Sequence, residues 1–336
     1  MNKRVILAKR PVDLPKDEDF SVIEEPIGQL KEGEVLVKVE WLSVDASQRV
    51  YISGQRSYTD PVPVGGVIKG LGIGQVIESQ SHAFKKGNYV SGLLGWQEYS
   101  KLPANHLTLL PPHENPRLFL GVLGITGLTA YFTVNELAKP KQGETMLVST
   151  AAGAVGSLIC QMGKMKGCKV IGLTGSDEKC QYLTRELGID GAINYKKVEN
   201  LSQAIKAACP DGVDVYIDNV GGEILDAALL NINKYARIVM CGAISSYNKK
   251  TAPPVHYYPL IISMSATIVG FIVFDFKNKY GLATKHLSKW LQQKKLKFSE
   301  HVVDGLENAP SALRLLLKGE NTGKVLVRVT SGSPKL

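Results

Sequence analysis

A short glycine-containing turn is the part of the sequence with the clearest chemistry. It reads Ala152-Gly153-Ala154-Val155-Gly156, between the strand-like run 145–150 and a helix-like run that continues to about Lys166. Glycine here lets backbone N–H groups approach a pyrophosphate at the positive end of the following helix. The motif is shorter than G-x-G-x-x-G, so its meaning depends on its place between strand and helix. We predict a dinucleotide site here; the alternative is that Gly153 and Gly156 only permit tight packing.

The tip of the second strand indicates which dinucleotide binds. An NAD site usually has an acidic side chain there, which binds the ribose hydroxyls. This strand ends in Leu173-Thr174-Gly175-Ser176, without a carboxylate, and Lys179 follows on the first helical turn. Small residues leave room for a 2′-phosphate, and a lysine offers it a point charge. We therefore predict NADPH. The alternative is that Asp177 and Glu178 cap the helix and Lys179 is simply exposed.

The positions of these motifs follow from a change of pattern along the chain. The first 125 residues contain short strand-like runs broken by Gly and Pro, which predict a compact, partly closed β domain. After about Gly124, strands at 145–150, 168–173, 191–195, 213–218 and 237–241 are mostly separated by helical segments. Such alternation predicts a parallel sheet with right-handed crossovers. The last 40 residues are β-like again, so we expect a β domain interrupted by an α/β domain.

Composition and charge are those of a globular protein with two domains. The chain has 336 residues, 44% hydrophobic and 21% charged, with a formal net charge of +9. The positive charge favours anionic partners in general. Four lysines gather near one helix end, and we interpret them as a solvated face that complements the helix dipole: Lys289, Lys294, Lys295 and Lys297. No nucleic-acid motif accompanies them, so no nucleic-acid partner is expected.

No membrane partner is expected either, and the predicted location is the cytoplasm. The apolar stretch 257–274 is about long enough to span a bilayer, but Pro259, Gly270 and three hydroxyl residues interrupt it. We interpret it as a loop followed by a buried strand at 266–273. The basic N-terminal stretch has an apolar run too short for a signal peptide and reads as a strand. The C-terminal Pro334-Lys335-Leu336 is one residue from a peroxisomal Ser-Lys-Leu signal.

Several segments together resemble one protein family. They include Gly153-Ala154-Val155-Gly156-Ser157, Gly175-Ser176-Asp177-Glu178-Lys179, Asp218-Asn219-Val220-Gly221-Gly222 and Cys241-Gly242-Ala243-Ile244-Ser245-Ser246-Tyr247-Asn248. The resemblance is to the zinc-independent medium-chain dehydrogenases/reductases: prostaglandin reductases, leukotriene B4 dehydrogenases, plant alkenal double-bond reductases and bacterial curcumin reductases. It covers essentially the whole chain. The fold it implies is α/β, with a Rossmann doubly wound parallel sheet inserted in a GroES-like, partly closed β-barrel domain.

The resemblance also implies which domain binds the substrate, which binds the cofactor, and what reaction the protein catalyses. Residues 1–125 plus 296–336 would form the catalytic, substrate-binding domain, and residues 126–295 the NADP-binding domain. The family uses NADPH to reduce the carbon–carbon double bond of α,β-unsaturated aldehydes and ketones, so the expected partner is a small, hydrophobic unsaturated carbonyl compound. Its members are usually homodimers joined through their nucleotide domains, and the strand at 266–273 is the edge expected to pair.

The cofactor contacts of the family transfer to this chain position by position. They fall on Gly153, Ala154, Val155, Gly156, Lys179, Tyr195, Asn219, Cys241, Gly242, Ala243, Ile244, Ser245, Ser246, Tyr247, Phe271, Ile272, Val273 and Asn321. Zinc-using relatives bind a catalytic metal through Cys and His of the β domain. Here the first 159 residues contain no cysteine, and the histidines His82, His106 and His113 show no ligand spacing. A catalytic zinc needs three protein ligands, so no metal is expected.

Without a metal, the chemistry must depend on the cofactor, and the protein must stabilise an enolate through a hydrogen-bond donor. Two tyrosines common in the family are missing, because Ser47 and Ser263 stand in their places. Tyr258 is the first candidate donor, and Tyr51 and Tyr58 are the next two. The alternative is that these rings only pack over the cleft. Quinone reduction with the same cofactor, and a non-catalytic nucleotide- or RNA-binding protein, are the other functions that the sequence leaves open.

Overall fold

The computed structural model describes residues 1–55 and 57–329. The chain divides into two compact units, Met1–Gly121 with Glu300–Leu336, and Val122–Ser299. The tripeptide Pro334-Lys335-Leu336 lies outside the described residues.

The first unit is built mainly from antiparallel strands. Its larger sheet has the order β14-β15-β3-β4-β5-β7, with β6 also paired to β3, while β1 and β2 form a separate pair. The strands are β1 (Asn2–Leu7), β2 (Phe20–Glu25), β3 (Glu34–Val44), β4 (Gly72–Ser79), β5 (Tyr89–Gly92), β6 (Tyr99–Pro103), β7 (Leu107–Leu109), β14 (Glu300–Asp304) and β15 (Lys324–Arg328). Two register shifts along β3 bend this long central strand. The predicted β-rich domain is confirmed; closure into a barrel stays a prediction.

Helical elements of the first unit are short, apart from α10. They are η1 (Asp17–Asp19), α1 (Ser47–Tyr51), η2 (Ala104–His106), η3 (Pro116–Leu120), η7 (Leu306–Asn308) and α10 (Ala309–Leu317). Helix α10 packs on β3 and β15. Its buried face, with Ala312 and Leu313, joins a core that includes Val37 and Trp96. Burial of this apolar face, rather than helix propensity, is what stabilises α10.

The second unit is a six-stranded parallel sheet with helices on its faces. Its strand order is β10-β9-β8-β11-β12-β13. The strands are β8 (Thr145–Val148), β9 (Lys169–Thr174), β10 (Gly191–Asn194), β11 (Val213–Asp218), β12 (Ile232–Met240) and β13 (Thr267–Gly270). The helices are α2 (Ile125–Phe132), η4 (Thr133–Ala138), α3 (Ala154–Met165), α4 (Asp177–Gln181), η5 (Tyr182–Glu186), α5 (Leu201–Ala208), α6 (Gly222–Leu229), α7 (Ile244–Tyr247), α8 (Pro259–Ser263), η6 (Val273–Lys279) and α9 (Tyr280–Gln292).

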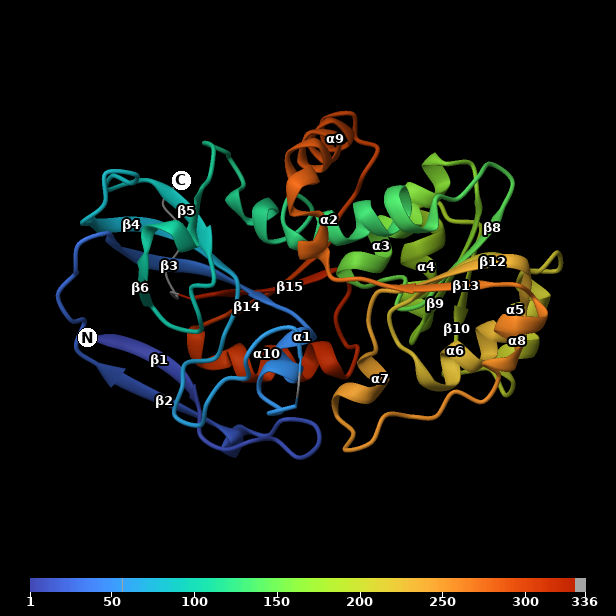
Figure 1. Cartoon of the computed structure of the whole chain (residues 1–336), viewed down its shortest axis with the longest axis horizontal. Coiled ribbons are helices and arrows are strands. Elements are labelled where there is room, and N and C mark those ends of the chain that lie inside the picture. Colours follow the sequence, from blue (N-terminus) through green and yellow to red (C-terminus); the bar gives the residue numbers. More distant parts are fainter. Residues whose placement is uncertain (56, 330–336) are drawn as a thin grey trace. The chain divides into compact units, whose positions relative to one another are not determined.

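The strand order explains how the helices are distributed. From β8 the chain moves outward through β9 to β10, and from β11 it moves the other way through β12 to β13. Right-handed crossovers then place α3 and α4 on one face of the sheet and α6 on the other. In Figure 1, α2 and α3 lie together on one side of the strands, and α5 and α6 on the opposite side. The predicted Rossmann doubly wound sheet is confirmed.

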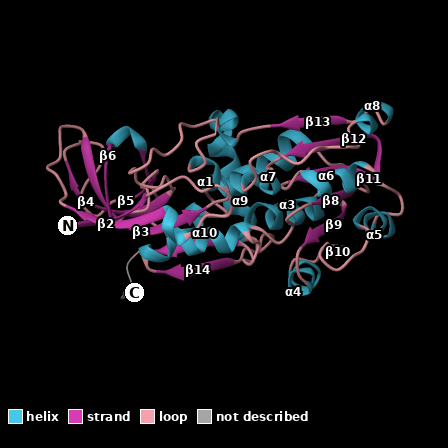
Figure 2. Cartoon of the chain, turned by 90° about the horizontal axis from the view of Figure 1, so that it is seen from below, coloured by secondary structure: helices cyan, strands magenta, loops and turns pink. Residues whose placement is uncertain are grey.

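The stretch 257–274 differs from its prediction. A helix, α8, begins at Pro259 where we expected a loop, because a proline at the first helical position is compatible with helix geometry. The predicted strand 266–273 is shorter, and its description as buried is wrong: β13 is mostly exposed. The reason is its place at the end of the sheet: within the described ranges its one strand partner is β12, and the two arrows run parallel in Figure 2. Among the described residues, no helix combines the length and apolarity needed to cross a bilayer.

Candidate functional site

The candidate site lies where the strand order of the parallel sheet reverses. Strands β8 and β11 are neighbours, but they continue into α3 and α6, on opposite faces. Open α/β sheets bind ligands in the crevice at such a point. Gly153 is the N-cap of α3, and glycine has no side chain that could accept a hydrogen bond, so the first-turn N–H groups of Ala154, Val155 and Gly156 have no side-chain capping acceptor there. These donors and the positive helix end fit a pyrophosphate.

The turn before α3 approaches the helix so closely that one glycine is required. A Cβ on Gly156 would lie 2.3 Å from the carbonyl oxygen of Thr150 and 3.0 Å from Cα of Ala151. Both neighbours are backbone atoms of the turn itself, so they cannot rotate away. Thr150 has φ 51°, a left-handed conformation that costs free energy for a β-branched residue. Gly156 therefore has a packing role, and that role places the helix N–H groups at the crevice.

The tip of β9 carries the groups that would select between NADPH and NADH. Ser176 caps α4, and its hydroxyl accepts a hydrogen bond from the Lys179 backbone at 3.3 Å. The Asp177 carboxylate accepts hydrogen bonds from Asn194, at 2.7 Å, and from Lys197, and these contacts lower its pKa. The charge of this carboxylate is thus balanced by Lys197, and its other oxygen accepts a hydrogen bond from the Asn194 amide. Lys179 lies on the same helix and is half-buried, so the tip carries a second cation beside a carboxylate that is already paired with Lys197.

Tyr195 lies beside the same tip. Its hydroxyl would be 3.0 Å from a Cβ placed on Gly175, so a side chain at that position would crowd the Tyr195 ring. The backbone of Tyr195 donates to Thr174, the last residue of β9, at 3.0 Å. Burial raises the pKa of Tyr195, which keeps its hydroxyl neutral and able to donate. Lys179 and Tyr195 therefore lie at the carboxyl ends of adjacent strands.

The loops after β11 and β12 are held together. The backbone N–H groups of Cys241 and Gly242 donate to the Asp218 carbonyl at 2.7 and 3.1 Å. The Ile244 N–H donates to Asn219 at 3.3 Å, so the segment 241–247 follows the turn at 219–221. Burial raises the pKa of the Cys241 thiol to about 11, and the thiol is therefore neutral near pH 7. Cys241 contributes shape at this edge rather than a reactive thiolate.

The residues after β13 are partly buried. Val273 is buried and its carbonyl oxygen accepts a hydrogen bond from the Tyr280 hydroxyl at 3.1 Å. The Phe271 ring meets the edge of Phe276, with 6.1 Å between centroids. Ile272 is the N-cap of η6, and its carbonyl oxygen accepts a hydrogen bond from the Asp275 N–H at 2.9 Å. These contacts describe how residues 271–273 are held; a cofactor contact there stays a prediction.

Tyr258 stands on an anchored loop and is exposed. It is the residue before α8, and 60% of its surface is accessible. The Asp226 carboxylate on α6 holds the two preceding residues, accepting from the backbone of His256 at 2.8 Å and of Tyr257 at 3.1 Å. It also contacts Nδ1 of His256 at 2.8 Å. The chain immediately before Tyr258 is therefore held, while Tyr258 itself is largely exposed.

The other two candidate tyrosines form a pair in the first unit. The hydroxyl oxygens of Tyr51 and Tyr58 lie 2.6 Å apart, and their rings meet edge to face. Burial is the main reason that the pKa of Tyr51 is raised. Asn321 belongs to the same unit; it is buried and donates to the Gly323 carbonyl at 2.8 Å. Nearby in sequence, Lys324 Nζ is 2.5 Å from the Asp45 carboxylate.

Sequence reasoning missed three residues of the crevice. Ser149 and Asp218 lie at the carboxyl ends of β8 and β11 and are fully buried, and Thr150 has the strained backbone described above. Asp218 lies within a segment that carries the family resemblance, but nothing local distinguishes its role from that of Asn219. The only signal available was a carboxylate at the end of an apolar strand, 213–218.

No metal centre is apparent in the described parts, 1–55 and 57–329: no three His, Cys, Asp or Glu side chains gather there in a way that could bind an ion. All five cysteines are free, and Cys160, Cys168 and Cys209 are buried. Burial raises the pKa of Cys168 and of Cys209 to about 11. The absence of a metal stays a prediction from the residue types of the first domain.

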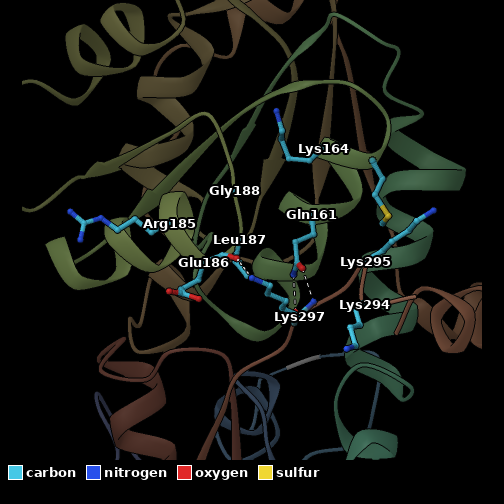
Figure 3. A pocket seen from close by; sticks show the side chains of 10 residues that line it. Gln161, Lys164, Arg185, Glu186, Leu187, Gly188, Lys294, Lys295 and Lys297 are labelled. Atoms are coloured by element: carbon cyan, nitrogen blue, oxygen red, sulfur yellow. Dashed lines mark hydrogen bonds between the residues drawn. The ribbon is translucent and has the colours of Figure 1, made fainter. Parts of the chain in front are cut away.

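A basic pocket of about 390 Å³ lies in the second unit, away from the crevice, where α3 and η5 end and the chain leaves α9. Two of its cations are engaged: Lys164 Nζ is 2.8 Å from Asp190, and Lys297 Nζ donates to the Glu186 carbonyl at 2.7 Å. In Figure 3 the side chains of Lys164, Arg185 and Lys295 point in different directions. Cations at helix carboxyl ends stabilise those ends. The geometry favours a solvated face rather than an anion site.

Comparisons with known proteins agree with the geometry. Residues 3–110 match a family model described as the N-terminal domain of oxidoreductase, and residues 154–289 match one described as zinc-binding dehydrogenase. The chain is 38% identical to the NADPH-dependent curcumin reductase of Escherichia coli, over 98% of this chain and 97% of that protein. It is 39% identical to the 2-alkenal reductase (NADP(+)-dependent) of Nicotiana tabacum, over 98% of both chains.

A solved structure shows the same fold over the full length. The crystal structure of CurA in complex with NADPH from Vibrio vulnificus has a TM-score of 0.94 and 36% identity, covering 98% of this chain and 100% of that chain. The second family model is named for zinc, but the first 159 residues of this chain lack the thiols that such a site uses. The chain belongs to the medium-chain dehydrogenase/reductase family of oxidoreductases, in the branch that contains the curcumin, 2-alkenal and prostaglandin reductases.

Proposed function

We propose that this protein uses NADPH to reduce the carbon–carbon double bond of α,β-unsaturated aldehydes and ketones. The observation that carries the proposal is the crevice between β8 and β11, where uncapped N–H groups of α3 lie in the same unit as Lys179. Full-length similarity to an NADPH-dependent curcumin reductase and a 2-alkenal reductase supports the cofactor and the substrate class. The expected substrate is a small hydrophobic molecule with a conjugated carbonyl group.

The nucleotide would be held by groups at the carboxyl edge of the parallel sheet. In this proposal the first turn of α3 binds the pyrophosphate, and Lys179 and Tyr195 bind the 2′-phosphate side. Asn219, the segment 241–247, residues 271–273 and Asn321 are proposed as contacts of the other half. We propose that residues 126–295 form the NADP-binding domain, and that residues 1–125 with 296–336 form the substrate domain.

The protein's own task in the reaction is to orient the substrate and stabilise charge. When bound, NADPH supplies the hydride that the β-carbon of the substrate accepts. Negative charge then develops on the carbonyl oxygen, and a positioned hydroxyl that donates a hydrogen bond lowers the free energy of that enolate. Tyr258 is the proposed donor, since Asp226 anchors the two residues before it and Tyr258 itself is exposed. The α-carbon then takes a proton from Tyr258 or from water.

A panel of substrates tests the function directly. NADPH oxidation is measured with alkenals, alkyl enones of the 15-oxo-prostaglandin type, curcumin-type dienones and quinones. We expect consumption with the conjugated carbonyl compounds and a saturated product by mass spectrometry. Faster turnover of quinones than of every enone would replace this function by quinone reduction. Salt-sensitive RNA binding without NADPH consumption on any enone would instead indicate a non-catalytic protein.

Tyr258→Phe is expected to lower kcat for an enone by about tenfold or more, because it removes a hydrogen bond that is strongest in the transition state. The dissociation constant for NADPH should stay unchanged. Tyr257→Phe is a matched control, since it is an adjacent, exposed tyrosine on the same anchored loop. Equal kcat values for wild type and Tyr258→Phe would remove Tyr258 from the mechanism and leave Tyr51 and Tyr58 as the candidates to test.

We also propose a homodimer in the cytoplasm, formed through the exposed edge of β13. An unpaired strand edge is a template for pairing with a second chain. Ile268 in this strand is 37% exposed. Across a two-fold axis, Ile268→Asp would bring like charges together, so the variant is expected to sediment as a monomer while wild type sediments as a dimer. A wild-type monomer at micromolar concentration would contradict this proposal.

A further inference from the structure

The buried side chains of Ser149 and Asp218 join the carboxyl ends of β8 and β11, where the chain leaves the sheet in opposite directions. The Ser149 hydroxyl donates toward the Ile217 carbonyl and the Asp218 carboxylate, each at 3.3 Å. It also accepts a hydrogen bond from the Asn219 backbone at 2.8 Å. The Asn219 side-chain amide donates to the Ser149 carbonyl at 2.7 Å. Asn219 is therefore held to β8 through both its backbone and its side chain.

Asp218 holds the rest of the same turn. Its carboxylate is fully buried and accepts hydrogen bonds from the Tyr216 hydroxyl at 2.8 Å, the Val220 N–H at 2.9 Å and the Gly221 N–H at 3.0 Å. No cation is among these partners. A buried carboxylate without a cation costs free energy unless donors surround it. Burial raises the pKa of Asp218, and the backbone donors of the turn oppose that rise.

The turn that is held in this way supports the next loop. The Ser245 hydroxyl donates to the Val220 carbonyl at 2.6 Å, and the Ser245 N–H donates to the same oxygen at 3.1 Å. Gly221 has φ 73°, a conformation that favours glycine. In this conformation its N–H donates to the Asp218 carboxylate while the Val220 carbonyl accepts from Ser245. The carboxylate of Asp218 thus fixes the turn at Val220 and Gly221, and Val220 in turn holds Ser245 of the segment 241–247. Ser149, which bonds to the same carboxylate, holds Asn219.

We propose that Asp218 and Ser149 are positioning residues for NADPH, holding Asn219 and the segment 241–247 in the geometry that the nucleotide meets on binding. The proposal rests on the NADPH site described above. A positioning role differs from a role in stability alone, because it changes the affinity for NADPH. Residues that are already held in place lower the free-energy cost of ordering the site when the cofactor binds. Neither residue needs to touch the nucleotide itself.

The chain supplies a matched control on the same strand. Asp214 lies at the opposite end of β11, where its carboxylate accepts from the Thr145 N–H and from the Asn233 amide, each at 2.8 Å. It therefore joins β11 to β8 as Asp218 does, but far from the crevice. Asp218→Asn and Asp214→Asn each place an amide donor where a carboxylate accepted hydrogen bonds, and both are expected to lower the melting temperature of the protein without cofactor.

The discriminating measurement is the NADPH dissociation constant, read from cofactor fluorescence below both melting temperatures. We expect about a tenfold increase for Asp218→Asn and none for Asp214→Asn. Ser149→Ala removes the acceptor of the Asn219 N–H and should give an increase of similar size, which keeps the test available if Asp218→Asn does not fold. Equal dissociation constants for wild type, Ser149→Ala and any folded Asp218→Asn would overturn the inference. Failure of wild type to bind NADPH would instead overturn the proposed function.

Discussion

Gly156→Ala is expected to raise the NADPH dissociation constant by about a hundredfold or more, the largest effect of any single substitution considered. The new methyl group would lie 2.3 Å from the Thr150 carbonyl oxygen. Backbone atoms of the turn cannot move aside without displacing the start of α3. The first-turn N–H groups would then lose their alignment with the pyrophosphate, and two charge-assisted hydrogen bonds account for an effect of this size.

Gly163→Ala is the control on the same helix. A Cβ there meets Cε of Met146 at 1.9 Å, the flexible end of a side chain, at a site near the far end of α3. We expect some loss of melting temperature and an unchanged NADPH dissociation constant. The NADPH dissociation constants of Gly156→Ala and Gly163→Ala are both measured by titration of cofactor fluorescence. An unchanged constant for Gly156→Ala would show that α3 does not bind the pyrophosphate.

Lys179→Ala is expected to raise KM for NADPH about 30-fold, equivalent to about 2 kcal/mol, while KM for NADH stays the same. The reason is that the lysine would contact only the 2′-phosphate, which NADH lacks. The neighbouring carboxylate of Asp177 is already paired with Lys197. We therefore do not expect it to bind the ribose hydroxyls and improve NADH binding when Lys179 is removed. The ratio of kcat/KM for the two cofactors is the measurement.

Lys166→Ala controls for the general effect of charge. It removes the same charge from an exposed position at the end of α3, away from the tip of β9. We expect no change in the cofactor ratio. A parallel rise in KM for both NADPH and NADH in Lys179→Ala would mean that this residue supports the fold of α4 and does not recognise the phosphate.

Local signals in the sequence predicted the parallel sheet, the turn at 152–156 and the family. These features depend on short-range physics: alternation of strand and helix patterns, glycine where the backbone must approach closely, and a strand tip without a carboxylate. The absence of cysteine before residue 160 is equally visible in the residue types alone. Such properties need no knowledge of which strands become neighbours.

Other features required the tertiary structure. The exposure of β13 follows from its place at the end of the sheet, which its apolar composition does not reveal. Tyr51 and Tyr58 meet because a loop returns in the first unit. Ser149 and Asp218 are 69 residues apart, and they meet only because β8 and β11 pair where the strand order reverses. Pairing between distant strands is set by packing of the whole sheet, and no local pattern in the chain encodes it.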